Sequence, residues 1–314
     1  MMKQNIVAVI GPTASGKTAL SVELAKHFSG EIISADSMQI YKTMDIATAK
    51  PTEEEKQGIP HHLMDFLDPS EEFSVARFCE LAKTAITDIA ARDHLPIVTG
   101  GTGLYVDALL GDMQFEETEV DPVLRTTITA DVQEKGVDKT LDYIRTFDPA
   151  SAERLSIGRN PQRLIRCIEV YLSTGMTQTQ LNEKQKGSGS PYHAIKLGLT
   201  ASDREFLYER INRRVDLMME NGLLEEARQF YDRQSGDTAS AAIGYKELLP
   251  HLGGELDLDI CVANLKRATR RYAKRQMTWF KRDESIRWFN IDEQSFDEIL
   301  NEASEMIKKE FHYE

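Results

Sequence analysis

The chain has 314 residues, of which 41% are hydrophobic and 28% charged, and a formal net charge of −13 at pH 7. This length and composition predict an ordinary soluble globular protein of about two domains, and no apolar run approaches the ~20 residues of a membrane helix. Three cysteines that lie far apart in the sequence argue against a disulfide framework or a zinc cluster. Because the N-terminus leads straight into a strand-like run, we expect no signal peptide and a cytoplasmic location.

The first predicted strand, Ile6 to Ile10, is followed at once by the segment GPTASGKT, Gly11 to Thr18. This segment has the G-x-x-x-x-G-K-[ST] spacing of a phosphate-binding loop, and a helix-forming run follows it. In such a loop, successive backbone N–H groups surround phosphate oxygens at the positive N-terminus of a helix. Lys17 could reach a terminal phosphate, and the Thr18 hydroxyl could ligate Mg²⁺.

Two further strands are predicted at Glu31 to Ala35 and Leu95 to Thr99, with a helix that begins at Ser74 between them. The alternation indicates a parallel sheet with right-handed crossovers. In such sheets ligands bind at the carboxyl ends of the strands, where the loop, Asp36 and the turn GGTGLY, Gly100 to Tyr105, all fall. Asp36 is therefore a candidate general base or Mg²⁺ ligand; the alternative is a turn or cap aspartate.

From about Gly111 to Ala194 the sequence shows no strand-like run and favours helices, among them Asp121 to Gly136 and Asn160 to Gly175, with a flexible connector at residues 184–191. Because the strand pattern resumes at Ala194 to Leu199, we interpret residues 112–193 as a helical insertion in a core formed by residues 1–111 and 194–314. The predicted fold is α/β: a P-loop NTPase-like parallel sheet flanked by helices, with an all-helical insertion domain.

The last third is predicted to be mainly helical, with a final strand at Ile286 to Ile291 and a final helix at Phe296 to Phe311. On the helix predicted at Asp203 to Asn221, Arg210 and Arg214 lie one turn apart. That spacing could direct a guanidinium group at a diphosphate, or the two could be surface ion pairs.

A basic run occupies the segment from Asn264 to Arg282. On a helix, most of its cations span about half the circumference and apolar residues fill most of the other half. This pattern favours binding to a phosphate backbone, the alternative being a solvated charged face. The run contains eight basic residues and no acidic one: Lys266, Arg267, Arg270, Arg271, Lys274, Arg275, Lys281 and Arg282.

A histidine pair and a tyrosine can each be explained by packing or hydrogen bonding within the protein. His61 and His62 have no further ligand residues at metal spacing, so we expect a packing or hydrogen-bonding pair. Tyr245 could stack on a base or pack in the interior.

Six segments, in order across nearly the whole chain, resemble the bacterial tRNA dimethylallyltransferases (tRNA isopentenyltransferases): GPTASGKT, ISADSMQIYKTMDIATAKP, VTGGTGLY, NPQRLIR, IGYKEL and KRQMTWFKR. The resemblance implies transfer of a dimethylallyl group from its diphosphate to the exocyclic amine of the adenosine immediately 3′ of the anticodon. It implies Mg²⁺ as the cofactor, and dimethylallyl diphosphate and the tRNA anticodon stem-loop as partners, with no membrane and no obligate protein partner.

The resemblance also implies roles for single residues. Asp36 would be the base, with Thr18, Thr102 and Arg214 as further catalytic residues and Thr18 at the metal. The diphosphate would be held by Gly11, Pro12, Thr13, Ala14, Ser15, Gly16, Lys17, Thr18 and Arg214. The tRNA would contact Asp36, Ser37, Met38, Gln39, Thr102, Arg125, Gln162, Arg163, Arg166, Gly244, Tyr245, Lys246, Lys274, Arg275, Gln276 and Lys281. The family commonly has Gly where this chain has Thr43 and Ala47.

Three other functions fit parts of the sequence. A P-loop small-molecule kinase would use the same loop for ATP, but it does not call for the basic helix. A prenyltransferase that acts on free AMP would need neither the insertion nor the basic run. A non-catalytic RNA-binding protein could use the loop as an anion site, and Asp36 argues against it.

Overall fold

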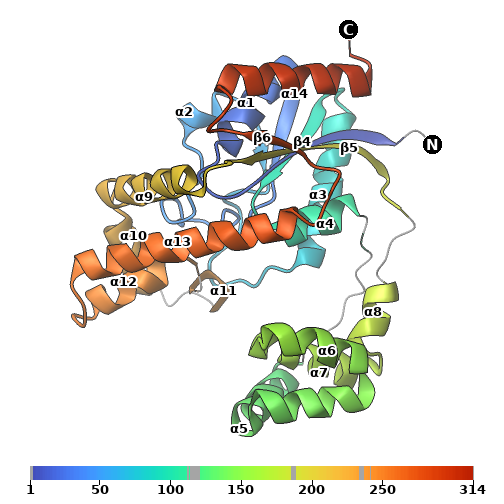
Figure 1. Ribbon diagram of the computed structural model, residues 1–314, viewed down its shortest axis with the longest axis vertical. Helices are drawn as coiled ribbons and strands as arrows, with labels where there is room; N and C mark the ends of the chain where they lie inside the picture. The colour runs from blue at the N-terminus through green and yellow to red at the C-terminus, as the bar shows by residue number, and fades with distance from the viewer. Residues whose placement is uncertain are drawn as a thin grey trace. The chain divides into compact units, whose positions relative to one another are not determined.

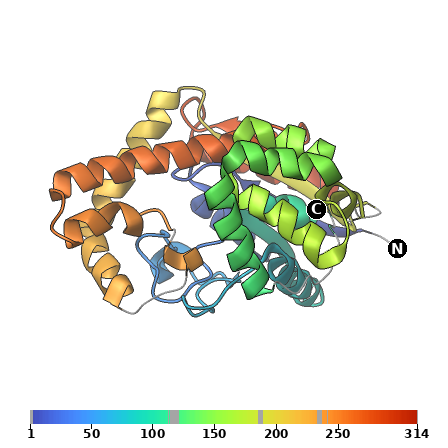
Figure 2. The ribbon, with the colours of Figure 1, turned by 90° about the horizontal axis from the view of Figure 1, so that it is seen from below.

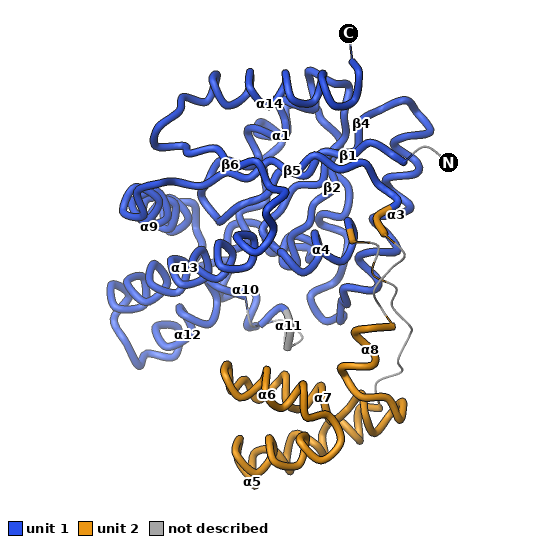
Figure 3. Tube along the Cα trace, turned by 45° about the vertical axis from the view of Figure 1, so that its right-hand side comes forward, with its two compact units in different colours: residues 1–110, 191–314 blue, residues 111–190 orange. Residues whose placement is uncertain are grey.

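The computed structural model describes residues 3–111, 113, 121–184, 189–232, 237–240 and 242–313. The chain divides into two compact units, one formed by residues 1–110 and 191–314 and the other by residues 111–190 (Figure 3). The sequence places the corresponding boundaries at 112 and 193. In the described ranges, no helix is both long and apolar enough to cross a membrane.

A parallel sheet lies at the centre of the first unit (Figure 1), as the sequence predicts. Its strand order, which the sequence does not predict, is β3-β2-β4-β1-β5-β6. In β1, residues 6–10 are no more than 1% exposed, which makes it the central strand of the core. The strands are β1 (Gln4–Ile10), β2 (Gly30–Ser34), β3 (His61–His62), β4 (Leu95–Gly100), β5 (Tyr192–Thr200) and β6 (Arg287–Asn290).

Strand β3 is an edge strand that the sequence does not predict. Its two residues pair with Ile32 and Ile33 of β2. A strand of two residues has no periodicity to detect. The expectation of a hydrogen-bonding pair is confirmed, since His61 Nδ1 lies 2.8 Å from the Ile59 carbonyl oxygen and His62 Nε2 lies 2.6 Å from Glu31 Oε2.

Helices cover both faces of the sheet. Helix α1 (Lys17–His27) and α14 (Phe296–Phe311) lie on one face, and α3 (Val75–Ala90) and α4 (Gly103–Leu110) on the other (Figure 1). The chain moves from β1 to β2 through α1 and then returns through α3 to β4, which lies between β2 and β1. Because the two connections run in opposite directions across the sheet, right-handed crossovers place α1 and α3 on opposite faces. Helix α3 begins as predicted, with the Ser74 side chain accepting a hydrogen bond from the Arg77 N–H.

A second core of the first unit joins the segment after β2 to the C-terminal helices. Ile40, Tyr41, Phe230, Tyr245 and Leu265 are among its buried members. Helix α13 packs beside α12 and also contacts α9 and α4 (Figure 2). The remaining helices of this unit are α2 (Glu53–Lys56), α9 (Arg204–Glu220), α10 (Leu223–Asp232), α11 (Asp237–Ser240), α12 (Tyr245–Leu252) and α13 (Leu258–Phe280).

The second unit is helical in its described residues: α5 (Pro122–Phe147), α6 (Pro149–Gly158), α7 (Pro161–Thr174) and α8 (Gln178–Lys184). Ile144 and Leu164 are fully buried in its core. The predicted stop at Gly136 is a break inside α5, because this residue has φ 76° and ψ 169° and the helix then resumes. Gly175 ends α7 in the left-handed conformation, as the sequence predicts. Residues 185–188 of the predicted connector lie outside the described residues.

A buried carboxylate ties β2 to β3 and to the turn before β4. Glu31 is 4% exposed. It accepts hydrogen bonds from Arg92 Nη2 at 2.8 Å and lies within 2.7 Å of His62 Nε2 and His94 Nδ1. Burial alone would raise the pKa of Glu31, but hydrogen bonds from Arg92, His62 and His94 lower it to about 2.

We expect Glu31→Gln to lower the free energy of unfolding at pH 7 by about 2 kcal/mol, because a carboxylate with a depressed pKa stabilises the folded state when ionised. This contribution is fully present above the unfolded-state pKa of about 4.5 and is lost as the pH falls toward the folded-state value of about 2. Urea unfolding of the wild type and of Glu31→Gln between pH 7 and pH 2.5 measures the difference in their free energies of unfolding. A difference that stays constant over this range would contradict the assignment.

Candidate active site

The segment Gly11–Thr18, hereafter the P-loop, joins β1 to α1 at the carboxyl end of the sheet. Gly11 has φ 145°, and a Cβ there would lie 2.4 Å from the Leu199 carbonyl oxygen, so only glycine fits. Ala14 and Gly16 also have positive φ, at 64° and 94°. The Ser15 hydroxyl, 2% exposed, donates to the Pro12 carbonyl at 2.9 Å and braces the turn from inside.

Lys17 folds back over the P-loop and donates from Nζ to the Pro12 carbonyl at 2.7 Å. Burial lowers the pKa of Lys17 to about 7; the nearby Arg214 also lowers it, and Asp36 raises it. A bound anion would favour the charged lysine, so these surroundings suit a negatively charged ligand.

Helix α9 supplies two guanidinium groups to the P-loop. Arg210 Nε donates to the Ala14 carbonyl at 2.9 Å, and Arg214 Nη1 lies 3.4 Å from Thr13 Oγ1. The two residues are one helical turn apart, as the sequence indicates. Burial lowers the pKa of Arg214, and Asp36 raises it. The cations Lys17, Arg210 and Arg214 therefore gather at one loop.

Asp36 lies two residues after the end of β2, at the same carboxyl edge of the sheet as this loop, with β4 between β2 and β1. Its Oδ1 accepts a hydrogen bond from the Met38 N–H at 2.9 Å. Its charge contributes to the pKa shifts of Lys17 and Arg214, and also of Tyr105 and Tyr272. The carboxylate is thus within electrostatic reach of the P-loop cations.

The turn after β4 is fastened to the segment that carries Asp36. The Thr102 hydroxyl accepts from the Ser37 N–H at 3.0 Å, and the Thr102 N–H donates to the Ala35 carbonyl at 3.2 Å. Burial raises the pKa of Tyr272, as does Asp36, whereas a hydrogen bond with Thr102 opposes the shift. The structure therefore brings together Asp36, Ser37 and Thr102, all predicted from the sequence, and adds Tyr272. In the helical pattern of the basic run, Tyr272 falls on the apolar side.

Gln39 has a structural role. Its Oε1 accepts from the Ser34 hydroxyl at 3.1 Å, and its Nε2 donates to the carbonyls of Thr48 and Ala49, both at 3.2 Å. These bonds close the segment after β2 on itself. In this segment Thr43 adopts φ 61°, a conformation that costs a β-branched residue free energy.

Glu226 of α10 fixes the same segment from outside. Its carboxylate accepts from the N–H groups of Asp45, Ile46 and Ala47 at 2.8–2.9 Å, and from the Tyr245 hydroxyl at 2.9 Å. Tyr245 is 0% exposed, so it packs in the interior. Of the two alternatives that the sequence leaves open for Tyr245, stacking on a base or packing in the interior, the structure shows packing. Gly244 and Lys246 flank it, and the Lys246 side chain is half-exposed, at 51%.

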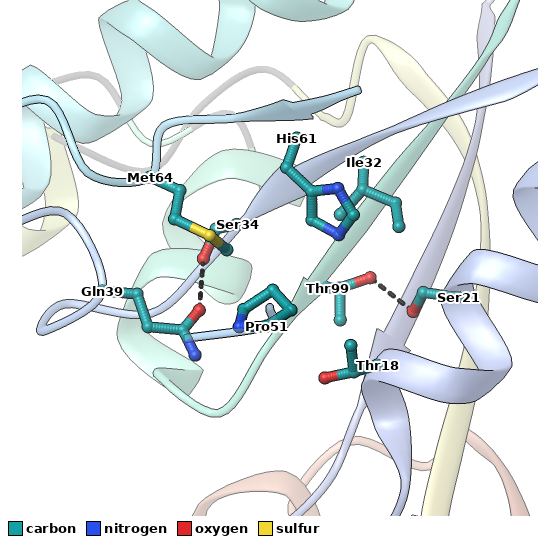
Figure 4. Close-up of a pocket in the computed structure, with 9 residues that line it drawn as sticks. All are labelled: Thr18, Ser21, Ile32, Ser34, Gln39, Pro51, His61, Met64 and Thr99. Atoms are coloured by element: carbon teal, nitrogen blue, oxygen red, sulfur yellow. Dashed lines mark hydrogen bonds between the residues drawn. The ribbon is translucent and has the colours of Figure 1, made fainter. Parts of the chain in front are cut away.

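A small pocket opens beside Thr18 (Figure 4). Ser21 and Thr99 share a hydrogen bond of 2.6 Å on one side of it, and Ser34 and Gln39 on the other. The lining is rich in hydroxyl and amide oxygens, with Met64, Ile32 and Pro51 as the apolar part: Thr18, Ser21, Ile32, Ser34, Gln39, Pro51, His61, Met64 and Thr99.

Mg²⁺ fits this donor set as a partner of a phosphate ligand. Over the described ranges, no group of three or more His, Cys, Asp or Glu side chains could hold an ion by itself. Mg²⁺ prefers oxygen ligands and commonly takes most of them from water and substrate phosphates. The Thr18 hydroxyl is the protein ligand that such an arrangement would use.

Helix α13 has the two faces that the sequence predicts. Cys261, Leu265, Ala273 and Phe280 are buried. Three cations of the run are engaged: Lys266 Nζ lies 2.5 Å from Asp216 Oδ1, Arg270 donates to Asn212, and Arg282 lies over the Trp279 ring, 4.1 Å from its centre. Among the described residues, five cations of this run have no acidic partner within 4.0 Å: Arg267, Arg271, Lys274, Arg275 and Lys281.

Gln276 does not lie on the exposed face. It is 5% exposed, and both ends of its amide bond to backbone groups of the site. Its burial corrects the assignment of this side chain as a direct tRNA contact.

In the helical unit, the predicted RNA-contacting residues fall into two kinds. Gln162 and Arg163 are exposed at the start of α7. Arg125 and Arg166 both bond to the Glu169 carboxylate, at 3.0 and 2.7 Å, and are 46% and 41% exposed. Because Glu169 is 1% exposed, these two arginines compensate a buried charge.

The fold and site define an α/β protein with a P-loop, three cations gathered at that loop and a carboxylate at the same edge of the sheet. The IPP transferase family profile matches residues 39–283, more than half of the chain, and the Isopentenyl transferase profile matches residues 4–66. The chain belongs to the IPP transferase family. It is an enzyme, a prenyltransferase.

Individual relatives agree over nearly the full length. The tRNA dimethylallyltransferase of Acetivibrio thermocellus is 49% identical over 94% of this chain and 95% of that protein. That of Halalkalibacterium halodurans is 45% identical over 98% and 97%.

Two solved structures are also similar. The full-length tRNA isopentenylpyrophosphate transferase from Bacillus halodurans is 43% identical, with 99% and 97% of the two chains covered and a TM-score of 0.74. A eukaryotic dimethylallyltransferase acting on tRNA is 30% identical, with 98% and 79% covered and a TM-score of 0.82.

Proposed function

We propose that this enzyme transfers a dimethylallyl group from dimethylallyl diphosphate to the exocyclic amine of the adenosine immediately 3′ of the anticodon in tRNA. One observation carries the proposal: the cationic P-loop and the Asp36 carboxylate lie within electrostatic reach of each other at the carboxyl edge of the sheet, in a member of a family whose relatives are named tRNA dimethylallyltransferases. An anion site beside a general base is what this reaction requires.

On the donor side, the P-loop N–H groups, Lys17 and Arg214 would bind the diphosphate. In the reaction, the bond between the allylic carbon and the diphosphate oxygen breaks, and negative charge develops on the leaving oxygens. Fixed positive charges at those oxygens stabilise the transition state more than the ground state. Mg²⁺, held by the Thr18 hydroxyl and by diphosphate oxygens, would supply further positive charge when bound.

On the acceptor side, the adenine amine nitrogen forms the new bond to the allylic carbon and gives up one proton. Asp36 would accept this proton, since its Oδ1 is held by the Met38 N–H and its carboxylate is within electrostatic reach of Lys17 and Arg214. Thr102 and Ser37, which are hydrogen-bonded to each other, would position the adenine. The adenine must leave the base stack of the anticodon loop to reach this site.

The exposed cations of α13, together with Gln162 and Arg163 of the helical unit, would contact the tRNA backbone. Unpaired cations on one face suit a polyanion, although the chain carries a net charge of −13.

The site of modification tests this proposal. Unmodified tRNA, incubated with labelled dimethylallyl diphosphate and Mg²⁺ and then digested, should carry the label on the adenosine immediately 3′ of the anticodon. Label at another nucleotide would contradict the proposed acceptor.

We expect Lys274→Ala with Arg275→Ala to weaken tRNA binding and to reduce the salt slope of log K by about 1.5, because each phosphate contact contributes about 0.7 to 0.9 to that slope. Filter binding over a range of salt concentrations measures both quantities. Lys308→Ala with Lys309→Ala removes two neighbouring exposed cations from α14 and should leave the slope unchanged. An unchanged slope in the α13 variant would remove this helix from the interface.

A further inference from the structure

The amide of Gln276 connects α13 to two loops of the site. Its Oε1 accepts a hydrogen bond from the Thr13 N–H of the P-loop at 2.9 Å, and its Nε2 donates to the Gly101 carbonyl at 3.0 Å. The side chain is 5% exposed. We infer that Gln276 is the positioning residue that holds the P-loop in its diphosphate-binding conformation, an inference that rests on the proposed function.

Close packing of α13 against Gly101 and Gly103 fixes the position of the Gln276 amide. A Cβ on Gly101 would lie 2.1 Å from Gln276 Nε2, and a Cβ on Gly103 would lie 2.2 Å from the Trp279 ring. The glycines of the turn after β4 therefore allow α13 to lie directly against it. Gln276 reaches the Thr13 N–H only because Gly101 has no side chain.

The chemistry at this position requires a neutral amide. One partner is a backbone N–H, which needs an acceptor, and the other is a carbonyl, which needs a donor. A glutamate would present a second acceptor to the Gly101 carbonyl and place a negative charge beside the diphosphate. A methionine of similar volume would satisfy neither partner, and buried backbone groups without partners are costly.

Thr13 connects Gln276 to Arg214, the cation that would bind the leaving diphosphate. Its backbone N–H bonds to Gln276, while its hydroxyl lies 3.4 Å from Arg214 Nη1. A shift of Thr13 would therefore move both a P-loop amide and the contact to Arg214. On the solvent-exposed part of the same helix lie Lys274 and Arg275. Helix α13 thus presents cations to solvent with one face and holds the P-loop with the other.

The test compares Gln276→Met with Gln229→Met, which removes an exposed amide whose Nε2 bonds to Glu225 within α10. Calorimetry with inorganic diphosphate and Mg²⁺ should show about tenfold weaker binding to Gln276→Met than to the wild type. Its KM for dimethylallyl diphosphate should rise similarly, with KM for tRNA within twofold. Gln229→Met should match the wild type in each measurement.

A second variant, Gly101→Ala, would move the Gln276 amide without replacing it. Gly101→Ala should displace Gln276 and give the same loss of diphosphate affinity, but should cost little further in a Gln276→Ala background, where the added Cβ has room. Additive losses would overturn the inference. So would a higher KM for tRNA with normal diphosphate binding, or a lower melting temperature with normal binding. A wild type that binds no diphosphate would contradict the proposed function instead.

Discussion

Replacing Asp36 with Asn is expected to lower the rate of prenyl transfer at saturating substrates by about 10²- to 10⁴-fold, the usual contribution of a general base. Asparagine keeps an oxygen that can accept the Met38 N–H, so the turn after β2 should retain its shape. The variant loses only the group that can take the proton from the adenine amine. Single-turnover transfer of labelled prenyl group to tRNA measures the rate.

Two controls separate this effect from damage to the site. Asp36→Asn should still bind inorganic diphosphate, because the P-loop, Lys17 and Arg214 are unchanged. Asp88→Asn removes an exposed carboxylate from α3 and should leave the rate unchanged. If Asp36→Asn keeps full transfer activity, Asp36 is not the base, and the proposed division of roles fails.

Replacing Arg214 with Met is expected to reduce kcat/KM for dimethylallyl diphosphate by about 100-fold, or ~3 kcal/mol of transition-state stabilisation. The guanidinium group lies at Thr13 Oγ1, beside the position proposed for the leaving diphosphate. Steady-state kinetics with varied donor and saturating tRNA measure the change.

Arg213→Met is the matched control, because Arg213 is the preceding residue on α9 and is exposed. Both variants remove one positive charge from the same helix. Equal losses in the two variants would mean that the general charge of α9, and not the contact of Arg214 with the P-loop, supports the reaction.

The sequence predicts most of the sheet because β1, β2, β4 and β5 are largely buried apolar runs that end at identifiable turns. The P-loop spacing, Asp36 and the GGTG turn all occur at strand ends, and parallel pairing brings these ends together. The arginines of α9 follow from helical spacing. Strand β3 is missed because two residues carry no periodic signal.

The residues that hold the site together are harder to predict. Gln276 bonds to Thr13, which lies 263 positions earlier in the chain, and Glu226 binds N–H groups about 180 positions away. Helical periodicity indicates which face of α13 is buried, but not which backbone group that face meets. The resemblance implies a tRNA contact for Gln276 along with Lys274 and Arg275, but its side chain is buried while theirs are exposed. For the same reason the sequence leaves open whether Tyr245 packs in the interior or stacks on a base.

The most direct measurement is transfer of label from dimethylallyl diphosphate with Mg²⁺ in parallel reactions that contain unmodified tRNA, AMP or neither, with ATP turnover followed alongside. The proposed function predicts label in tRNA only, with release of diphosphate and no consumption of ATP. Label in AMP would replace the proposed acceptor. No label, with ATP hydrolysed or its phosphate transferred, would mean that the P-loop binds a nucleotide and that the proposed reaction is wrong.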